Sequence, residues 1–261
     1  MTQKKGILLV SFGTSYLDSK EKTIDLILED VKKAFPQYYI YQAWTSKTIL
    51  HILKTRDNLS IFSLEEAMEK IKADGIDSLT VQPTHLINGL ENDVMVRTIQ
   101  AYSSDNFKIS FGAPLLSSTE DQKSALTAVL SDFSSISKEE ALVLMGHGTT
   151  HHANSIYAAL DYMLKEMGHP NVLIGTVEAY PGLDTLIRQV AKLHPKRVHL
   201  LPFMLVAGDH ANNDMAGEQP DSWKSLFEAA GYEVLCHLKG LGENKGIRKI
   251  YLEHLREAMD N

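Results

Sequence analysis

Three side chains in the second half of the sequence could together ligate a transition metal: His147, Glu178 and His210. Each follows an apolar, β-rich run, and in a parallel α/β sheet the carboxyl ends of the strands meet at the edge where ligands bind. Two imidazoles and a carboxylate suit Co²⁺, Ni²⁺, Fe²⁺ or Zn²⁺ and leave coordination positions free. These residue types therefore predict an open metal site. The simpler alternative is that His147 and Glu178 cap local turns and that His210 is a surface residue.

The residues next to the two histidines fit turns that present a side chain. Gly146 and Gly148 bracket the first histidine, and glycine allows positive φ angles and the close approach of a bulky ligand. Asp209 and Asp214 flank the second histidine and are candidates to orient its imidazole by hydrogen bonding. A tight strand-to-helix turn and solvated acidic side chains would explain the same residues without a metal.

Apolar runs rich in β-forming residues alternate with segments of helical periodicity along the whole chain, which is typical of βα units on a parallel sheet. The expected strands span residues 7–11, 38–43, 78–82 and 107–111 in the first half, and residues 141–145, 172–177, 198–205 and 233–237 in the second. A terminal helix is expected over residues 245–259, and the serine-rich stretch 131–140 is the candidate linker. The sequence thus predicts the α/β class.

Short segments of the first half recur in the same order in the second half. Residues 8–14 align with 143–149, residues 41–44 with 177–180, and residues 83–89 with 202–208. This alignment sets His147 opposite Phe12, Glu178 opposite Gln42, and His210 opposite Glu91. We therefore predict two similar α/β domains with parallel sheets, related by internal duplication: an N-terminal domain over residues 1–130 and a C-terminal domain over residues 141–261 that carries the metal site. The N-terminal domain would hold an additional helix near residues 46–55 and form a wall of the site.

The composition excludes several classes of protein. The chain of 261 residues has one cysteine, Cys236, so it has neither an intrachain disulfide nor a cysteine-rich metal cage. A formal net charge of −7 and the lack of lysine and arginine clusters argue against a nucleic-acid partner. Because the sequence lacks both a membrane-spanning apolar run and a signal peptide, we expect a cytoplasmic protein with no membrane partner. The sequence leaves open whether the chain forms a homo-oligomer.

Four segments resemble the CbiK family of anaerobic sirohydrochlorin cobaltochelatases, which belongs with ferrochelatase to the ATP-independent class II chelatases. The segments are ILLVSFGTS (7–15), MGHGT (145–149), TVEAYPG (176–182) and LPFMLVAGDH (201–210), and the resemblance extends from Ile7 to about His237. It implies two flavodoxin-like domains with the tetrapyrrole between them. It also implies that His147, Glu178 and His210 bind the metal and that Glu91 is a further acidic residue of the site.

The reaction implied by this resemblance is the insertion of Co²⁺, as the substrate metal, into sirohydrochlorin on the anaerobic route to cobalamin. His147 would be a ligand and the first proton acceptor, since a neutral imidazole can bind a metal or take a proton near neutral pH. His210 would be the second imidazole ligand and Glu178 a charge-compensating ligand, while Glu91 would relay protons or discriminate between metals. No nucleotide or other bound cofactor is expected, because the P-loop motif Gly-x-x-x-x-Gly-Lys-Ser/Thr is absent from the sequence.

Two other functions share part of these features. A tetrapyrrole or metal carrier would need the same ligands but would show no turnover. A histidine phosphatase also places a histidine after a strand, but it needs an arginine directly before that histidine, where this sequence has Gly146. The ligand types do not select between Co²⁺, Fe²⁺ and Ni²⁺. Because the chain is net negative, local basic groups or helix N-termini must bind the carboxylates of sirohydrochlorin.

Overall fold

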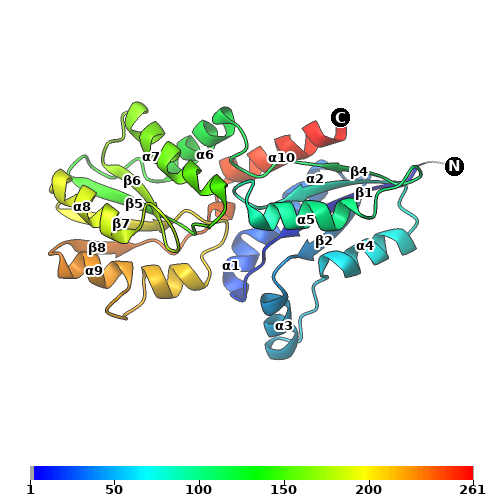
Figure 1. Ribbon diagram of the computed structural model, residues 1–261, viewed down its shortest axis with the longest axis horizontal. Helices are drawn as coiled ribbons and strands as arrows, with labels where there is room; N and C mark the ends of the chain where they lie inside the picture. The colour runs from blue at the N-terminus through cyan, green and yellow to red at the C-terminus, as the bar shows by residue number, and fades with distance from the viewer. Residues whose placement is uncertain (1–2, 261) are drawn as a thin grey trace.

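The computed structural model describes residues 3–260, which form two four-stranded parallel sheets that follow one another along the long axis of the molecule (Figure 1). The first sheet consists of β1 (Lys5–Ser11), β2 (Tyr39–Trp44), β3 (Ser78–Pro83) and β4 (Lys108–Phe111), in the order β2-β1-β3-β4. The second consists of β5 (Glu140–Gly146), β6 (Val172–Thr176), β7 (Arg197–Pro202) and β8 (Glu233–Cys236), in the order β6-β5-β7-β8. The identical order confirms the predicted α/β fold with two similar parts, called here the first and the second half.

Helices pack on the sheets and connect the strands. They are α1 (Leu17–Lys22), α2 (Ile24–Ala34), α3 (Lys47–Arg56), α4 (Leu64–Ala73), α5 (Leu90–Gln100), α6 (Thr119–Asp132), α7 (Ile156–Glu166), α8 (Leu183–Leu193), α9 (Trp223–Ala229) and α10 (Lys245–Asp260). Three short helices complete the chain: the 3₁₀-helices η1 (His152–Ser155) and η3 (Leu241–Glu243), and the π-helix η2 (Ala211–Met215). No helix within residues 3–260 is both long and apolar enough to cross a membrane.

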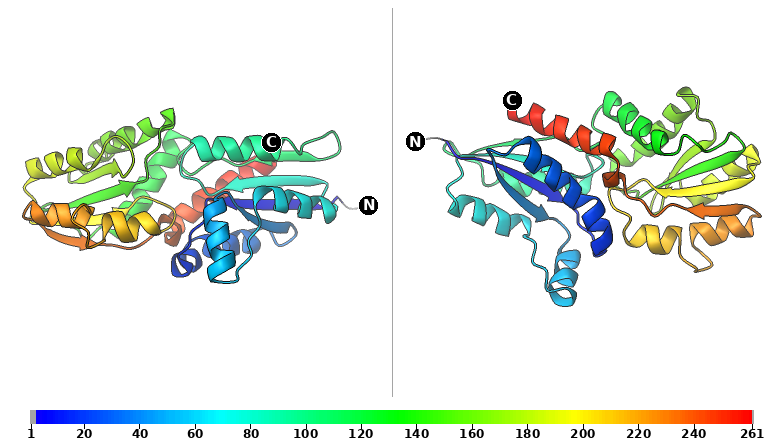
Figure 2. Two further views of the ribbon diagram at one scale, coloured as in Figure 1. Left: turned by 60° about the horizontal axis from the view of Figure 1, so that its bottom comes forward. Right: turned by 180° about the vertical axis from the view of Figure 1, so that it is seen from behind.

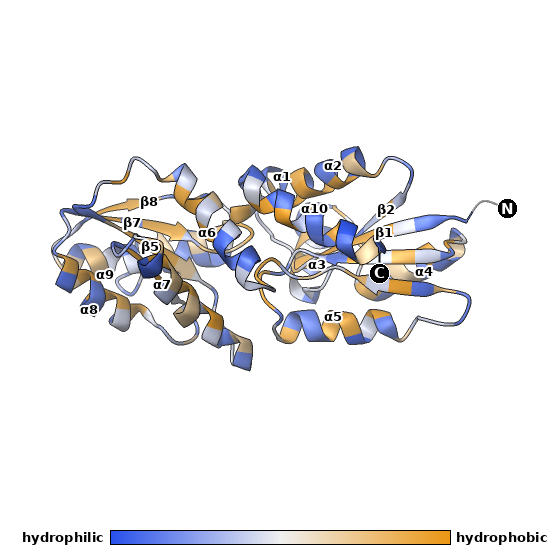
Figure 3. Ribbon diagram, turned by 90° about the horizontal axis from the view of Figure 1, so that it is seen from above, coloured by the Kyte–Doolittle hydropathy of each residue, from blue (hydrophilic) through white to orange (hydrophobic). Residues whose placement is uncertain are grey.

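One apolar core joins the two halves. Ile7 and Leu9 of β1 belong to the same buried cluster as Leu142 and Leu144 of β5, whereas Leu8 faces a separate cluster on the other side of the first sheet. A third cluster fills the corresponding face of the second sheet. Strands covered on both faces are apolar throughout. Figure 3 accordingly shows apolar stretches along the strands, whereas α5 and α10 alternate between apolar and polar residues.

The predicted strands are all present, with one clear difference in length. The strand expected over residues 198–205 ends at Pro202. Beyond this point the backbone oxygens of Met204 and Leu205 accept hydrogen bonds from Leu241 and Gly242 of η3. The segment after Pro202 therefore leaves the sheet and contacts η3 instead of extending β7. The predicted additional helix is α3, and the side chain of Ser46 caps its first turn by accepting a hydrogen bond from the backbone of Ile49.

The terminal helix does not pack where the sequence assigns it. The prediction places it in the C-terminal domain, but α10 packs against α2, β3 and β4 of the first half and against α6. Figure 2 shows α10, in red, running from the junction of the halves along the first half. Its stripe of Ile247, Tyr251 and Leu255 is buried there, because an amphipathic helix must cover its apolar face. The boundaries 1–130 and 141–261 otherwise stay a prediction.

Backbone hydrogen bonds correct one of the three repeat equivalences. The backbone of Ser46 donates to the oxygen of Phe12, and the backbone of Glu178 donates to the oxygen of His147. His147 therefore does correspond to Phe12, but Glu178 corresponds to Ser46 rather than to Gln42. Gln42 lies inside β2, beside Leu9 of β1. Similar residue types in the two halves predict that Gln42 is equivalent to Glu178, but the pairing of the strands does not support this alignment.

The third equivalence is supported by the same kind of evidence. Pro83 and Pro202 take the same place beside the central strand of their sheets, opposite Val10 and Met145. After them, the next helix begins in both halves with a backbone hydrogen bond to a glycine, from Asp93 to Gly89 and from Asn212 to Gly208. The spacing from these glycines places Glu91 opposite His210, as predicted.

Candidate metal centre

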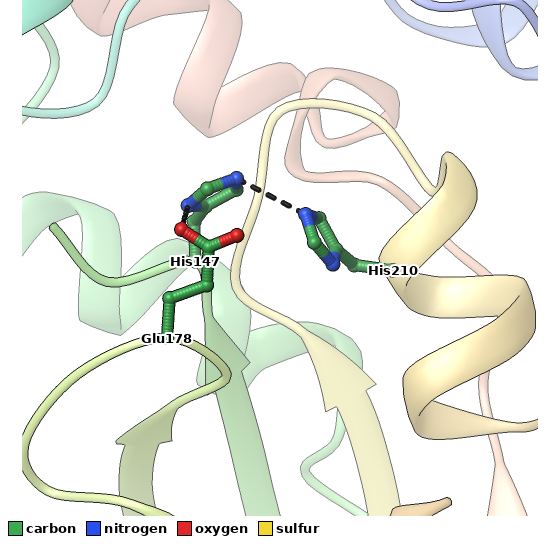
Figure 4. A group of neighbouring side chains, drawn as sticks. All are labelled: His147, Glu178 and His210. Carbon is green, nitrogen blue, oxygen red and sulfur yellow. Dashed lines mark hydrogen bonds and ion pairs between the residues drawn. The ribbon is translucent and has the colours of Figure 1, made fainter.

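The three predicted ligands meet at the carboxyl edge of the second sheet. His147 follows β5, Glu178 follows β6, and His210 follows β7 directly before η2 (Figure 4). One ligand atom from each lies within 4.8 Å of one ligand atom from both others. The Nε2 atoms of the two histidines are 3.1 Å apart, and Nδ1 of His147 is 3.6 Å from Oε2 of Glu178. Within residues 3–260 no second group of three such side chains occurs.

Glycine is required in the turn that carries His147. Gly148 has a φ angle of +88°, and a Cβ atom there would lie 2.9 Å from the backbone nitrogen of Ala179. A Cβ atom at Gly146 would lie 2.3 Å from the ring of Tyr157. Any larger residue at either position would push the turn away from the loop that carries Glu178 or from α7. The bracketing glycines therefore bring the first histidine and the glutamate together.

Hydrogen bonds orient both imidazoles in the same way. Nδ1 of His210 is 2.7 Å from Oδ2 of Asp214, and Nδ1 of His147 is 2.9 Å from the backbone oxygen of Gly148. A carboxylate and a carbonyl can only accept, so each Nδ1 carries a proton and each neutral ring keeps a lone pair on Nε2. Asp214 thus has the predicted orienting role.

The two Nε2 atoms are placed so that they could share one cation. The rings are nearly perpendicular, at 87°, and two lone pairs 3.1 Å apart repel each other unless a proton or a cation lies between them. Metal–imidazole bonds of about 2.0–2.1 Å, at tetrahedral to octahedral angles, would separate two nitrogens by about 2.8–3.4 Å. The half-exposed carboxylate of Glu178 can turn toward the same position. The arrangement therefore suits one divalent transition-metal ion with open coordination positions.

The other predicted residues lie around this group. Glu91 is exposed in the first turn of α5 and is not one of the three grouped side chains, so its predicted role is untested. Asp209 accepts a hydrogen bond from the hydroxyl of Tyr16, at 3.3 Å, rather than contacting the imidazole. From the same turn as Glu91, Asp93 reaches to 3.5 Å from Nε2 of His151. Sequence reasoning missed Tyr16 and Asp93, since no motif marks either residue.

Two groups near the strand ends have shifted pKa values. Burial, followed by the carboxylate of Asp209, raises the pKa of the Tyr16 hydroxyl, which therefore stays protonated and donates. Burial lowers the pKa of His85 to about 4. Both ring nitrogens of His85 are shielded from solvent and have no hydrogen-bond partner in the described part of the chain. His85 is therefore a neutral imidazole held in an apolar setting after β3.

Exposed apolar side chains follow the same strand ends. Phe12 and Leu17 come after β1, Leu90 and Val94 lie in the first turns of α5 after β3, and Tyr180 comes after β6. The contacts of Tyr16 and Asp93 with the second half show that these edges of the two sheets face each other. Large exposed apolar groups gathered on facing edges are typical of a binding site for a flat, partly apolar ligand.

Comparison with known proteins agrees with this geometry. The family model described as cobalt chelatase (CbiK) matches residues 5–260. The sirohydrochlorin cobaltochelatase of Salmonella typhimurium is 40% identical over 257 residues, which cover 98% of this chain and 97% of that protein. Sirohydrochlorin cobaltochelatase CbiKC of Nitratidesulfovibrio vulgaris is 35% identical over 259 residues, covering 98% of this chain and 91% of that protein.

A solved structure shows the same fold. SirB from Bacillus subtilis, determined with Fe³⁺, superposes with a TM-score of 0.66 at 16% identity, and the match covers 98% of this chain and 96% of that one. The predicted resemblance is therefore confirmed by the sequence family and by the arrangement of two similar halves. This chain belongs to the CbiK family of cobalt chelatases.

Proposed function

We propose that this chain inserts Co²⁺ into sirohydrochlorin, with His147, Glu178 and His210 as the ligands that hold the incoming metal. The observation that carries the proposal is the pair of Nε2 atoms, 3.1 Å apart, whose Nδ1 atoms both face acceptors. Both curated relatives named above are sirohydrochlorin cobaltochelatases, which supports this substrate pair. Co²⁺ is a substrate here, so the site must both bind it and release it.

The same residues account for the protons that the reaction liberates. Insertion breaks two pyrrole N–H bonds, forms bonds from the macrocycle to Co²⁺, and frees the two Nε2 atoms as the metal leaves them. Each imidazole can then take one proton on Nε2. A carboxylate lies at the opposite nitrogen of each ring, Glu178 at 3.6 Å from His147 and Asp214 at 2.7 Å from His210, and stabilises the imidazolium that forms. We assign His147 as the first proton acceptor.

The macrocycle would lie between the facing edges of the two halves. Phe12, Leu90 and Tyr180 offer it exposed apolar surface from both sides. Glu91, on the same edge of the first half, would relay protons or discriminate between metals. We expect no nucleotide requirement, because the sequence has no P-loop motif. A cytoplasmic location and the absence of nucleic-acid and membrane partners stay predictions.

Turnover separates this proposal from a carrier of tetrapyrrole or metal. Sirohydrochlorin in large excess over the protein is mixed with Co²⁺, and its visible spectrum is followed, with Fe²⁺, Ni²⁺ and Zn²⁺ in parallel. We expect many equivalents of cobalt product per chain, and metal insertion well above the rate without protein. His147→Ala should remove this activity, whereas His169→Ala, in the turn at the amino end of β6, should retain it. Product limited to one equivalent per chain would instead indicate a carrier.

A further inference from the structure

Each turn that carries a proposed histidine ligand makes a polar side-chain contact with the first half. Asp209, next to His210, accepts a hydrogen bond at 3.3 Å from the hydroxyl of Tyr16, which precedes α1. His151, in the turn after His147, has Nε2 at 3.5 Å from Oδ2 of Asp93 in α5. The loop of Glu178 has no such contact among the described side chains.

Local hydrogen bonds fix the groups that make the Tyr16 contact. The backbone nitrogen of Tyr16 donates to Oγ1 of Thr14 at 3.2 Å, and Asn213 donates to Asp209 at 2.8 Å. A Cβ atom at Gly208 would lie 3.4 Å from Oγ1 of Thr14, so the turns after β1 and β7 approach closely. The hydroxyl of Tyr16 is therefore held at the point where the two turns meet.

The second contact has a defined proton arrangement. Nδ1 of His151 accepts a hydrogen bond from the backbone of Ala153 at 3.2 Å, so a neutral ring carries its proton on Nε2, toward the carboxylate of Asp93. Half of the Asp93 side chain is exposed, whereas His151 is mostly covered. The contact is thus polar, partly hydrated and directed across the junction.

Away from the metal centre, the two halves meet through closely packed apolar side chains. At η3, a Cβ atom at Gly242 would lie 2.7 Å from Cβ of Thr23, and Leu241, Ile247 and Leu205 are buried in the core that both halves share. Separating the halves there would expose apolar surface, whereas separating the edges beside the metal centre breaks two polar contacts that water can replace. Opening is therefore easiest at the side where the macrocycle must enter.

We propose that Tyr16 and Asp93 are positioning residues that set the gap between the two halves and so retain the macrocycle over the metal centre. The inference rests on the proposed function, because it assumes a macrocycle between the two edges. All three proposed metal ligands lie in the second half, so neither contact is needed to bind Co²⁺ itself. Loss of either contact should weaken macrocycle retention and leave metal binding unchanged.

The test compares Tyr16→Phe, Asp93→Asn and the double variant with two matched controls in the full-length protein. Tyr162→Phe changes an exposed tyrosine of α7, and Asp105→Asn changes an exposed aspartate in the loop before β4. Sirohydrochlorin affinity is measured by fluorescence without metal, KM and kcat by insertion assays, product release by stopped flow, and Co²⁺ affinity by calorimetry. Thermal unfolding is recorded for every variant.

We expect each single variant to weaken sirohydrochlorin affinity, to raise KM and to speed product release by about three- to tenfold, with a larger effect in the double variant. Co²⁺ affinity and the unfolding temperature should equal those of the controls. Asp93→Glu, which keeps the carboxylate, should restore affinity to within about twofold of the wild type.

Three results would overturn the inference: macrocycle affinity and release equal to the controls, a parallel loss of Co²⁺ affinity, or a lower unfolding temperature with unchanged affinity. The proposed function is judged separately, by wild-type turnover. A wild-type chain that bound sirohydrochlorin without inserting Co²⁺ would refute that function, while the affinity comparison would still decide on Tyr16 and Asp93.

Discussion

The two halves of the molecule share a strand order but differ where the strands end. His147 after β5 corresponds to Phe12 after β1, and Glu178 after β6 corresponds to Ser46 after β2. The backbone hydrogen bonds that join these turns are the same in both halves, so the backbone offers the same positions twice. Among the described residues, only the second copy has a group of side chains that could hold a cation. A repeated fold can therefore keep one chemical site and use the equivalent edge of the other copy as a surface for the same ligand.

The substitutions with the largest expected effect test whether the two imidazoles of the second half take part in metal insertion. His147→Ala and His210→Ala should each lower the rate of Co²⁺ insertion by at least about a hundredfold, because each removes a direct ligand and a proton acceptor. The measurement is the initial rate of product absorbance, with His169→Ala as the control. Both side chains are partly exposed, so circular dichroism should show an intact fold. Wild-type rates in either variant would contradict the ligand assignment.

A pair of equivalent substitutions compares the two halves directly. Glu178→Ala should lower the insertion rate by about ten- to hundredfold, because the positive charge of the metal and of the imidazolium loses its nearest carboxylate. Ser46→Ala, at the equivalent position, removes the cap of α3 and should cost about 1 kcal/mol of stability while leaving the rate within about twofold of the wild type. The two readouts are insertion kinetics and urea unfolding. Equal losses of rate would mean that both copies take part in the chemistry.

We expect a smaller effect from a substitution that changes only the hydrogen bond orienting His210. Asp214→Asn keeps a side chain of the same shape but replaces the carboxylate at Nδ1 of His210, so we expect about a tenfold loss of Co²⁺ affinity. Calorimetric titration with Co²⁺ measures this loss, and it should show one ion per chain in the wild type and none in His147→Ala. Two equivalent sites per chain would show that the first half also binds metal.

The smallest effect concerns stability rather than chemistry. The pKa of His85 is lowered to about 4, from an ordinary value of about 6.5, so the unfolded chain takes up a proton before the folded chain does. The stability that depends on the neutral ring is complete above about pH 6.5 and is lost as the pH falls toward 4. Met204 holds the equivalent place in the second half, since its backbone oxygen accepts from Leu241 as that of His85 accepts from Leu115.

The unfolding free energy of the wild type should fall between pH 6.5 and pH 4. In His85→Met this loss should be smaller by on the order of 1–3 kcal/mol. Urea unfolding at several pH values measures the slope, and His169→Ala is the control for a partly exposed histidine. An unchanged slope in His85→Met would show that the imidazole of His85 titrates normally in the folded protein.

The strands and the grouping of His147, Glu178 and His210 were predictable, because the carboxyl ends of parallel strands meet and short apolar runs mark those strands. Gln42 was assigned wrongly because similar residue types do not define register, which depends on backbone pairing. The position of α10 was missed since its apolar stripe indicates a buried face but not the sheet that buries it. The contacts of Tyr16 and Asp93 depend on how the two halves are placed, and that information is spread over both sheets.

The packing of α10 also has a consequence for how the protein is made. The buried side chains of Ile247, Tyr251 and Leu255 cover the first sheet, yet they are translated after every strand of the second. The first half cannot complete its core while the end of the chain is still inside the ribosome. The first half can therefore complete its core only after the second half has been translated, and a nascent chain that stops before residue 245 leaves β3 and β4 uncovered.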